Sequence, residues 1–550
     1  MTDSLLFVPL GGVGEIGKNM SAVQCGDDII VIDTGLMFPD EEMPGVDIVI
    51  PDITWLTSNA DKVRGICLTH GHEDHIGGLP YVLRELDVPV YGTRLTLGLV
   101  RPKLAEHKLS DAGLHEVAAG DRVPLGCIEV EFIRVSHSIP DACSLAIRTP
   151  AGTIVMTSDF KFDPMPVDHR YTDIARFAEI GDEGVLALMS DCTNIEKEGH
   201  SQSESVLSRV FERVFSEAPG RIICTSFASN IHRIQQIADL AVKYDRQMSV
   251  VGRSMAQNVR TARELGYLKI PDWALLEVEK IPDRDPEKAV IMTTGSQGEP
   301  LSVLTRISND DHRRIKIQPG DTVVISAKPV PGNESLVHRV INNLFRRGAR
   351  VIYDDIEPVH VSGHANKEDL RMMLNLVRPK FVVPVHGEAR HLHLYSEMAL
   401  ETGYLSSDVI LLDVGDKLEL TADSAAVVGS VEQSGMVMVD GLGVGDVGDA
   451  ALRDRGHLAS DGVLVVVSTV DQVTGDLLDG PSIMSRGFMD EEEEFLSEAA
   501  DAIRDHLRDI PKDAVKDIAT ARLEIRNALA RFVNARTRRR PVIIPVVTEI

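Results

Sequence analysis

The chain carries the stretch Thr69-His70-Gly71-His72-Glu73-Asp74-His75, and this stretch decides the fold. It follows an apolar segment, residues 65–68, that is typical of a buried strand, and it precedes a helix expected from about residue 77 to residue 86. Three histidines and an aspartate therefore lie in one loop at a strand end. A solvent-exposed loop without a binding role would not explain three histidines and an aspartate within six residues, so we interpret the loop as a metal site.

The spacing within this loop favours two metal ions over one. Side chains of an extended segment alternate with a period of two, so His70 and His72 point to one side while Asp74 and His75 point elsewhere. One loop can therefore serve two adjacent cations. Imidazole and carboxylate ligands suit Zn²⁺ or Mn²⁺.

The composition is that of an ordinary folded protein with several domains. The chain has 550 residues, of which 43% are hydrophobic and 26% are charged. Since this length exceeds one hydrophobic core, about three or four domains are expected. Lysine and arginine number 57 against 84 acidic residues, which gives a net charge of −27. This charge excludes binding of nucleic acid or an anionic membrane by the whole surface, so a polyanionic substrate must be held locally.

Cysteine usage and hydropathy indicate a cytoplasmic protein. The six cysteines include no Cys-x-x-Cys pair, so buried reduced thiols are expected rather than a disulfide framework or a thiolate zinc site. The first residues lack the basic region of a signal peptide. The longest apolar stretches, such as Val463–Val467, are far shorter than the ~20 residues of a membrane helix.

The order of the expected elements indicates an α/β protein. Residues 1–190 have the pattern of many short strands separated by turns, with one helix at residues 77–86. From about Ser203 onward, strands and helices alternate, which is typical of a parallel sheet covered by helices. No internal repeat is visible.

The segment Gly12-Val13-Gly14-Glu15-Ile16-Gly17 matches the dinucleotide-binding pattern G-x-G-x-x-G, with Asp33 about twenty residues later. A dinucleotide loop must open a helix whose N-terminus faces the pyrophosphate. Residues 20–32 instead have the pattern of two strands joined by a turn at Gly26-Asp27-Asp28. The context therefore argues against dinucleotide binding.

Further acidic residues and a histidine stand at expected strand ends. They are Asp33 in Val31-Ile32-Asp33-Thr34-Gly35, His137 in Ser136-His137-Ser138-Ile139-Pro140-Asp141, and Asp159 in Thr157-Ser158-Asp159-Phe160. Together with the His-x-His-x-Asp-His loop, these motifs resemble the metallo-β-lactamase superfamily in type and order. The resemblance implies a dinuclear metal centre in which Asp33 orients a ligand and Asp159 bridges the two ions.

A βα segment inserted from about residue 203 to residue 350 narrows the resemblance to the β-CASP nucleases. Their later motifs are matched by Ser190-Asp191-Cys192-Thr193-Asn194, by His360-Val361-Ser362-Gly363-His364 and by Val385-His386-Gly387-Glu388. Finer matches resemble the bacterial ribonuclease J family, at residues 9–17, 137–142 and 225–230. The resemblance covers essentially the whole chain, and the tail least specifically.

This resemblance implies the fold class α/β, with a metallo-β-lactamase αββα sandwich, an inserted β-CASP βα domain and a small C-terminal α/β domain. The expected boundaries are 1–202 for the first part of the metallo-β-lactamase domain, 203–350 for the β-CASP domain, 351–435 for the completing part, 436–455 for a linker, and 456–550 for the C-terminal domain. A Gly-rich patch at residues 441–446 is expected to form a turn or a linker. The C-terminal domain is expected to serve oligomerisation or RNA contact.

The resemblance also implies two divalent cations per subunit, Zn²⁺ in preference to Mn²⁺. The first ion would take His70, His72, His137 and Asp159, and the second Asp74, His75, Asp159 and His386. Such ions lower the pKa of bound water from 15.7 to ~7, which supplies a nucleophile for phosphodiester hydrolysis. The family assigns the proton-donor role to Asp191 and the acceptor role to His364, and the sequence leaves open which residue does which.

Two segments offer phosphate contacts. The loop from His360 through Val361, Ser362 and Gly363 to His364 combines a hydroxyl, a glycine amide and two imidazoles, and it suits a phosphate cradle. Ser229 and Asn230 precede an expected helix, where they suit a second phosphate contact or simply cap the helix. Residues 201–270 hold ten Lys or Arg and six Asp or Glu, a local excess of four positive charges. The nucleic-acid groove is expected there.

By resemblance, the protein is a metal-dependent 5′→3′ exoribonuclease with endonuclease activity, preferring 5′-monophosphate RNA and acting in rRNA processing and mRNA decay. The expected partners are single-stranded RNA, further copies of the chain in a homodimer or homotetramer, and other RNA-decay proteins, without a membrane. Gly45, Asp47 and Asp440 match positions at which some relatives bind a structural Ca²⁺, and an ordinary turn is the alternative.

Three other functions are weighed against this one. A thioesterase or lactamase on the same metal platform lacks the βα insertion and the motif from His360 to His364. A DNA-directed β-CASP nuclease would share the metal motifs and the insertion, and only the finer matches to the ribonuclease J family argue against it. A catalytically silent RNA-binding scaffold has no chemical need for seven His and Asp ligands in register.

Overall fold

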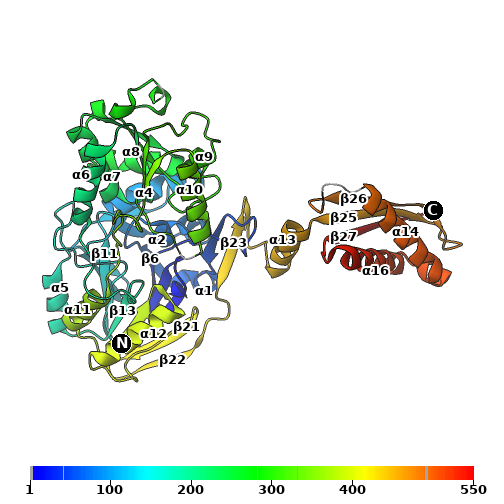
Figure 1. The fold of residues 1–550 in the computed structure, drawn as a ribbon. Helices are drawn as coiled ribbons and strands as arrows, with labels where there is room; N and C mark the ends of the chain where they lie inside the picture. The colour runs from blue at the N-terminus through cyan, green and yellow to red at the C-terminus, as the bar shows by residue number, and fades with distance from the viewer. Residues whose placement is uncertain (1–3, 41, 282, 331, 490–492) are drawn as a thin grey trace. The chain divides into compact units, whose positions relative to one another are not determined.

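The computed structural model (Figure 1) describes residues 4–40, 42–281, 283–330, 332–489 and 493–550. The chain forms two compact units. The first comprises Met1–Phe38 and Val49–Val437, and the second comprises Pro39–Ile48 and Met438–Ile550. Each unit has its own core of buried apolar side chains. None of the helices in the described ranges combines the length and apolarity that crossing a membrane requires.

Two sheets form the centre of the first unit. One has the strand order β22 (Ala425–Ser430), β21 (Asp416–Thr421), β1 (Ser4–Gly11), β3 (Met20–Cys25), β4 (Asp28–Ile32), β6 (Val63–Cys67), β7 (Val90–Thr93) and β8 (Leu114–Val117). The other has the order β19 (Phe381–Val385), β13 (Ala187–Asp191), β12 (Gly152–Met156), β11 (Cys143–Thr149), β10 (Ile128–Arg134) and β9 (Arg122–Leu125). Strands from before and after the insertion thus share both sheets.

Successive side chains along the strands of the first sheet lie on opposite faces and pack into different buried clusters. On β1, Phe7 belongs to the buried cluster shared with the second sheet, whereas Val8 belongs to the cluster that includes the helices α3 (Leu79–Glu85) and α4 (Arg94–Glu106). The helices that pack with the second sheet are α5 (Ile174–Glu183), α11 (Lys367–Val377) and α12 (Ala389–Glu401). Because strand side chains alternate, this arrangement gives the predicted helix-sheet-sheet-helix layers.

The inserted β-CASP segment forms a parallel sheet, as the alternation of strands and helices predicts. Its strand order is β15 (Gln247–Val251), β16 (Ala289–Thr293), β14 (Ile222–Thr225), β17 (Thr322–Ile325) and β18 (Arg350–Ile352). Its principal helices, green in Figure 1, are α6 (Leu207–Glu217), α7 (Ile231–Lys243), α8 (Arg253–Glu264) and α10 (Glu334–Arg346).

The prediction of a single helix before residue 190 is wrong. Besides α3, the structure has α4, α5 and two single turns, α1 (Thr54–Thr57) and α2 (Glu73–Ile76). Gly98 and Pro102 within α4 and Gly181 within α5 conceal these helices, because both residue types are unfavourable in helix interiors. A Cβ on Gly98 would stand 2.5 Å from the side chain of Leu265, which directly follows α8. The glycine therefore permits close packing between helices, a requirement that the local sequence does not reveal.

The second unit contains the small C-terminal α/β domain. Its sheet has the order β26 (Leu477–Arg486), β25 (Val463–Val470) and β27 (Val542–Glu549), and α14 (Glu493–Asp509) and α16 (Ile518–Thr537) share its core. Residues 436–455, expected as a linker, contain β23 (Met436–Asp440), β24 (Gly443–Val444) and the start of α13 (Asp449–Asp461). This segment is therefore regularly structured, and Gly441, with a φ angle of 58°, lies in the turn of the β23–β24 hairpin. The domain boundaries themselves stay a prediction.

The positive charge counted over residues 201–270 is only partly on the surface. Three of its ten basic side chains are buried and have local partners, namely Arg221, Arg233 and Arg246. These side chains hold β-CASP elements together and do not face solvent. The local charge excess therefore overstates what this segment offers to RNA.

Glu204→Ala is expected to destabilise the β-CASP domain by about 3 to 5 kcal/mol, because it leaves a buried guanidinium unpaired. Nη2 of Arg233 lies 2.6 Å from Oε2 of Glu204, and both residues are buried. Thermal unfolding followed by circular dichroism should show a lower midpoint than in the wild type. The control is Glu217→Ala, which removes an exposed pair with Arg350 and should cost under about 1 kcal/mol. Equal midpoints for the two variants would contradict a stabilising role for the internal pair.

Candidate metal centre

Parallel strands of both sheets end at the same place, and the predicted site residues follow these ends. In the first sheet β4 and β6 are parallel, so Asp33 and the loop of residues 69–75 leave the sheet together. In the second sheet β12, β13 and β19 are parallel, which places Asp159, Asp191 and His386 at one edge. His137 follows β10, which runs in the same direction as β12, so the carboxyl ends of six strands supply the site.

Three positions at these strand ends have a left-handed backbone. Asp33, Ser158 and His386 have φ angles of 58°, 50° and 53°. Such conformations of residues other than glycine cost on the order of 1 to 3 kcal/mol and persist where the surroundings hold them. Each marks an abrupt change of chain direction directly after a strand, which turns the following side chains toward the site.

His70, His72, His137 and Asp159 converge on one point. Nδ1 of His72 lies 3.2 Å from Nε2 of His70 and 3.1 Å from Nε2 of His137. Oδ2 of Asp159 lies 3.5 Å from each of the same two Nε2 atoms. Ligand atoms ~2.0–2.1 Å from a tetrahedral zinc ion are ~3.3 Å from one another. The spacing of the four side chains therefore fits an ion of this size.

Asp74, His75, Asp159 and His386 form a second group. Nε2 of His75 lies 3.5 Å from Oδ2 of Asp74 and 3.3 Å from Oδ1 of Asp159. Nε2 of His386 lies 3.4 Å from Oδ2 of Asp74. Asp159 thus presents one carboxylate oxygen to each group, which is the geometry of a bridging ligand. All seven residues expected as ligands meet in these two groups.

Two buried polar atoms of this cluster, Oδ1 of Asp159 and Nε2 of His386, have no hydrogen-bond partner among the described residues. Buried polar atoms are normally paired, because an unpaired one costs free energy. Both atoms belong to the second group, next to a pocket of about 330 Å³ that Asn19 and His75 also line. A cation would give both atoms a partner, so the residues present fit a divalent metal centre.

The two groups differ in their electrostatics. Burial and the neighbouring His70 lower the pKa of His72 to about 3, and burial with His72 lowers the pKa of His137 well below its usual value. Neutral imidazole is the form that binds a metal ion. Burial also opposes a charge on His386, but carboxylates, chiefly Asp159, raise its pKa to about 10. The second group therefore favours a positive charge, which a metal ion would supply.

Two of the expected ligands are oriented by hydrogen bonds on their far ring nitrogens. Nδ1 of His75 lies 2.7 Å from Oδ2 of Asp33, whose two oxygens also accept from the backbone N–H and the hydroxyl of Thr69. Nδ1 of His137 lies 2.8 Å from the carbonyl oxygen of Gly363. With Nδ1 donating in both rings, each Nε2 directs a lone pair toward the cluster.

Asp191 and His364, expected as the catalytic residues, form a pair beside the two groups. Nδ1 of His364 lies 2.8 Å from Oδ2 of Asp191, and its Nε2 lies 3.8 Å from Oδ2 of Asp159. Burial opposes protonation of His364, but the Asp191 carboxylate raises its pKa. Burial would raise the pKa of Asp191, but His364 and His386 lower it to about 2. The pair therefore favours a carboxylate and an imidazolium whose Nε2–H faces the cluster.

The loop from His360 to His364 borders the first ligand group through Gly363. A Cβ on Gly363 would stand 2.5 Å from the ring of His137, so only glycine fits there. Ser362 is half-buried, whereas the side chain of Val361 is buried in the core and leaves only its backbone for a substrate. Nδ1 of His360 is buried without a partner in the described ranges. Burial and the nearby Arg233 lower the pKa of His360 to about 4.

Ser229 and Asn230 lie at the start of α7. Oδ1 of Asn230 accepts from the backbone N–H of Arg233 at 3.0 Å, so Asn230 caps the helix, as one of the two sequence interpretations has it. The side chain of Arg233 in turn donates to the carbonyl oxygen of Val359 at 2.8 Å, directly before the loop from His360 to His364. The helix start and the loop are thus mechanically connected. A phosphate contact at Ser229 stays a prediction.

Several polar residues that sequence reasoning did not single out support the site. Nδ2 of Asn19 lies 3.4 Å from Oδ2 of Asp74, and the hydroxyl of Thr193 donates to Oδ1 of Asp191 at 2.8 Å. Lys161 and Asn194 hold the loop that contains Ser362, and Lys197 donates to Asn194. Proximity to Asp191 in the sequence is the only local signal for Thr193 and Asn194. The remaining contacts depend on the tertiary fold.

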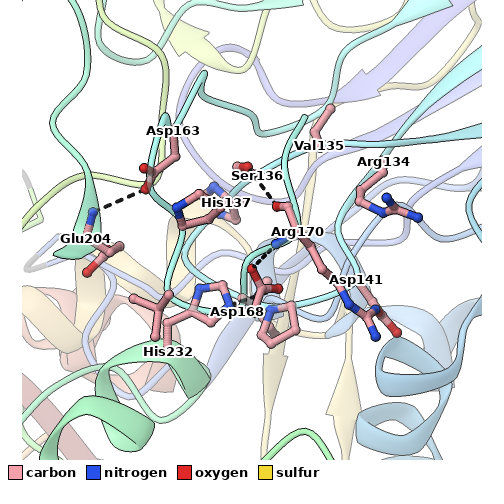
Figure 2. A pocket seen from close by; sticks show the side chains of 14 residues that line it. Arg134, Val135, Ser136, His137, Asp141, Asp163, Asp168, Arg170, Glu204 and His232 are labelled. Atoms are coloured by element: carbon pink, nitrogen blue, oxygen red, sulfur yellow. Dashed lines mark hydrogen bonds and ion pairs between the residues drawn. The ribbon is translucent and has the colours of Figure 1, made fainter. Parts of the chain in front are cut away.

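A second pocket, of about 370 Å³, lies beside His137 (Figure 2). Figure 2 shows its labelled walls, which combine Arg134 and Arg170 from the metallo-β-lactamase part with Glu204 and His232 at and after the start of the β-CASP segment. Both parts of the first unit therefore border His137, one of the expected ligands, on this side.

The residues expected to bind calcium lie together in the second unit. Oδ2 of Asp47 accepts from the backbone N–H of Gly441 at 2.8 Å. Asp440 is paired with Arg455, whose Nη2 is 2.5 Å from its Oδ2, and a Cβ on Gly45 would stand 2.9 Å from Nη1 of the same arginine. A guanidinium therefore supplies the positive charge at this position, and the calcium site stays a prediction.

Four segments of the chain match known protein families. Residues 13–182 match the metallo-beta-lactamase superfamily, and residues 219–344 match the beta-CASP domain of ribonuclease J. Residues 348–410 match the RNA specificity domain of Zn-dependent metallo-hydrolases, and residues 450–550 match the C-terminal domain of ribonuclease J. The matches follow the order of the elements along the chain.

Relatives match over the full length. Ribonuclease J2 of Bacillus subtilis is 40% identical over 552 residues, covering 100% of this chain and 99% of that protein. Ribonuclease J of Thermus thermophilus is 42% identical over 564 residues, covering 100% and 96%. A crystal structure of a protein of unknown function from Enterococcus faecalis covers 76% of this chain and 100% of its own, with a TM-score of 0.55 at 19% identity, which shows a shared fold.

Proposed function

Since the chain belongs to the ribonuclease J family, we propose that it degrades single-stranded RNA from the 5′ end with a preference for a 5′-monophosphate and also cuts internally. The chain is a metal-dependent ribonuclease, and therefore a hydrolase. The proposed biological roles are rRNA processing and mRNA decay.

One contact carries the 5′-end proposal, the 2.8 Å hydrogen bond between Nδ1 of His137 and the carbonyl oxygen of Gly363. His137 belongs to the first ligand group, and Gly363 belongs to the loop that suits a phosphate. Through this bond the loop is held at a fixed distance from the site of hydrolysis. A 5′-phosphate bound by the loop would therefore set the first scissile phosphate in register, which supports removal of single nucleotides.

The side chains around the centre have distinct proposed roles. When bound, two divalent ions supply water of pKa ~7 rather than 15.7 and positive charge for the scissile phosphate. Asp159 bridges the two ligand groups, and Asp33 orients His75. His364 donates its Nε2 proton to the leaving 3′ oxygen, and Asp191 holds the imidazolium; this assigns the donor role to His364 rather than to Asp191. The hydroxyl of Ser362 contacts the 5′-phosphate.

We expect 5′-monophosphate RNA to be degraded to mononucleotides roughly 10- to 100-fold faster than 5′-triphosphate RNA. A closed cradle excludes the added bulk and charge of a triphosphate, whereas a 5′-hydroxyl end loses hydrogen bonds to a charged phosphate that contribute roughly 1.5 to 3 kcal/mol each. Single-turnover assays on end-labelled RNA measure both rates. Ser362→Ala should narrow the preference more than it slows cleavage of a circular RNA, which has no 5′ end.

The same assays decide against the proposal if mono- and triphosphorylated RNA are degraded at equal exonucleolytic rates. If Ser362→Ala slows cleavage of the circular RNA by the same factor as degradation of the linear 5′-monophosphate RNA, Ser362 acts in general catalysis instead of end recognition.

The metal ions are proposed to be two Zn²⁺ ions per subunit, with Mn²⁺ as the alternative. The imidazole-rich first group and its spacing of 3.1 to 3.5 Å support zinc. A structural Ca²⁺ at Gly45, Asp47 and Asp440 is a weaker proposal, because Arg455 already pairs with Asp440. Metal analysis of the purified protein gives the identity and the number of ions.

We place the protein in the cytoplasm, where ribosomal and messenger RNA are found, with other RNA-decay proteins as further partners.

A homodimer or homotetramer is the proposed assembly. The C-terminal sheet supports self-association, because its face opposite α14 and α16 exposes apolar side chains. Met484 is 58% exposed, Ile544 is 46% exposed, and both lie beside Val465 in the sheet. Exposed apolar side chains that adjoin one another are typical of interaction surfaces.

Ile544→Glu is expected to reduce the assembled fraction at micromolar concentration, because it places a charge in the middle of this face. Light scattering with size-exclusion chromatography measures the mass. Val428→Glu, which changes a similarly exposed valine on β22, is the control and should leave the mass unchanged. If Ile544→Glu keeps the wild-type mass, this face does not mediate assembly.

A further inference from the structure

The hydroxyl group of Ser362 accepts two hydrogen bonds from the protein. Nδ2 of Asn194 lies 2.7 Å from Oγ of Ser362, and the backbone N–H of His364 lies 3.3 Å from the same atom. A hydroxyl has two acceptor sites and one proton to donate, so these bonds use both acceptor sites. No hydrogen bond from this hydroxyl to an acceptor in the described part of the chain is present, and the residue is half-buried. Its proton is therefore available to a substrate.

The amide of Asn194 is oriented by contacts at both of its ends. Nδ2 also lies 3.2 Å from the carbonyl oxygen of His364, which can only accept, so the NH₂ group must be on this side. Oδ1 accepts from Nζ of Lys197 at 2.5 Å, and an ammonium group can only donate. The two contacts agree, which leaves Asn194 as a donor to Ser362. Asn194 itself is 5% exposed, so a bound substrate would meet Ser362 before it met Asn194.

A third residue holds the backbone of Ser362. Nζ of Lys161 lies 3.3 Å from the carbonyl oxygen of Ser362 and 3.2 Å from that of Gln202, and Lys161 is fully buried. In a trans peptide the N–H of the next residue points opposite to the carbonyl. Lys161 therefore also directs the N–H of Gly363 away from itself. Ser362 is thus fixed at its carbonyl by Lys161 and at its hydroxyl by Asn194.

We propose that Asn194, oriented by Lys197, is a positioning residue that makes the Ser362 hydroxyl a hydrogen-bond donor to the 5′-phosphate of RNA. The inference rests on the proposed recognition of the 5′-monophosphate by Ser362. Phosphate oxygens only accept hydrogen bonds, so a hydroxyl whose acceptor sites are occupied by the protein is matched to them. Asn194 would thereby determine end specificity without touching the RNA.

The test is a double-mutant cycle of Asn194→Asp and Ser362→Ala. The aspartate has the shape of asparagine but only accepts, so the Ser362 hydroxyl would donate to it and lose its proton for the RNA. The readout is the ratio of kcat/KM on 5′-monophosphate RNA to kcat/KM on 5′-hydroxyl RNA of the same sequence, with cleavage of a circular RNA measured in parallel. We expect Ser362→Ala to lower the ratio roughly 10- to 100-fold and Asn194→Asp to lower it nearly as much.

The double variant separates positioning from simple charge repulsion. If Asn194 acts through Ser362, adding Asn194→Asp to Ser362→Ala should change the ratio by less than about 2-fold, since coupled residues are not additive. Asn366→Asp adds the same charge nearby, at a side chain that contacts the carbonyl of His200, and it should leave the ratio nearly unchanged. Metal content and the thermal midpoint of each variant check that the site and the fold persist.

Four results would overturn the inference. Additive effects in the double variant, or an equal effect of Asn366→Asp, would mean that charge alone lowers the ratio. An Asn194→Asp variant with the wild-type ratio would show that the Ser362 hydroxyl does not depend on Asn194. If instead Ser362→Ala leaves the ratio unchanged, the proposed 5′-end function is itself wrong, and the inference is wrong with it.

Discussion

Asp159→Asn is expected to reduce cleavage of RNA by about 10,000-fold while the fold stays intact. Each oxygen of Asp159 faces one ligand group, Oδ2 at 3.5 Å from His70 and His137 and Oδ1 at 3.3 Å from His75. An amide presents one oxygen and no charge, so it cannot serve both groups. Loss of the metal centre removes the activated water and the charge that offsets the transition state. Single-turnover cleavage and metal content are the measurements.

The fold should persist, because the strands that present the site have their own buried core. Asp87→Asn makes the same chemical change at an exposed position, and it should retain wild-type activity and metal content. His72→Ala should resemble Asp159→Asn, since it removes a ligand of the first group. A wild-type cleavage rate in either variant would be incompatible with a centre of two metal ions that share Asp159.

Asp191→Asn is expected to lower turnover by about 100- to 10,000-fold, the usual contribution of a general acid or base. The carboxylate lies 2.8 Å from Nδ1 of His364 and raises the pKa of that imidazole. Without the negative charge the pKa of His364 falls. If protonated His364 is the acid, the decline of kcat at alkaline pH should therefore begin at a lower pH in the variant. The pH dependence of kcat on a circular RNA measures this displacement.

A second substrate distinguishes proton donation from a structural role of the pair. When the leaving 3′ oxygen is replaced by sulfur, the thiolate departs without a proton, so the defect of Asp191→Asn and of His364→Ala should largely disappear. Persistence of the full defect on the sulfur substrate would show that neither residue delivers the proton.

Much of the fold was predictable, because its signals are local. The βα alternation after Ser203 predicts the parallel β-CASP sheet, and the strand pattern with its Gly26-Asp27-Asp28 turn predicts β3 and β4. The helices α4 and α5 were missed for the opposite reason. Gly98 and Gly181 disfavour a helix in isolation, and they are required only where α4 meets Leu265 and α5 meets the backbone of Leu376.

The charge argument from the sequence was only partly right for a similar reason. A count of basic residues does not distinguish a surface arginine from one such as Arg233, which is buried against Glu204. Composition reports which groups are present, and only packing decides which of them meet solvent.

The sequence by itself determined the order of the metal-binding motifs, the family they resemble and the seven candidate ligands, because these depend on residue type and short spacing. Only the tertiary structure decided which oxygen of Asp159 faces which group. It also decided that Asn194 and Lys161 hold Ser362. Those last contacts join residues that are 168 and 201 positions apart in the chain. They exist because β13, which precedes the inserted domain, pairs in parallel with β19, which follows it. No local pattern records such a pairing, since it is the packing of distant strands that brings these polar groups within hydrogen-bonding distance.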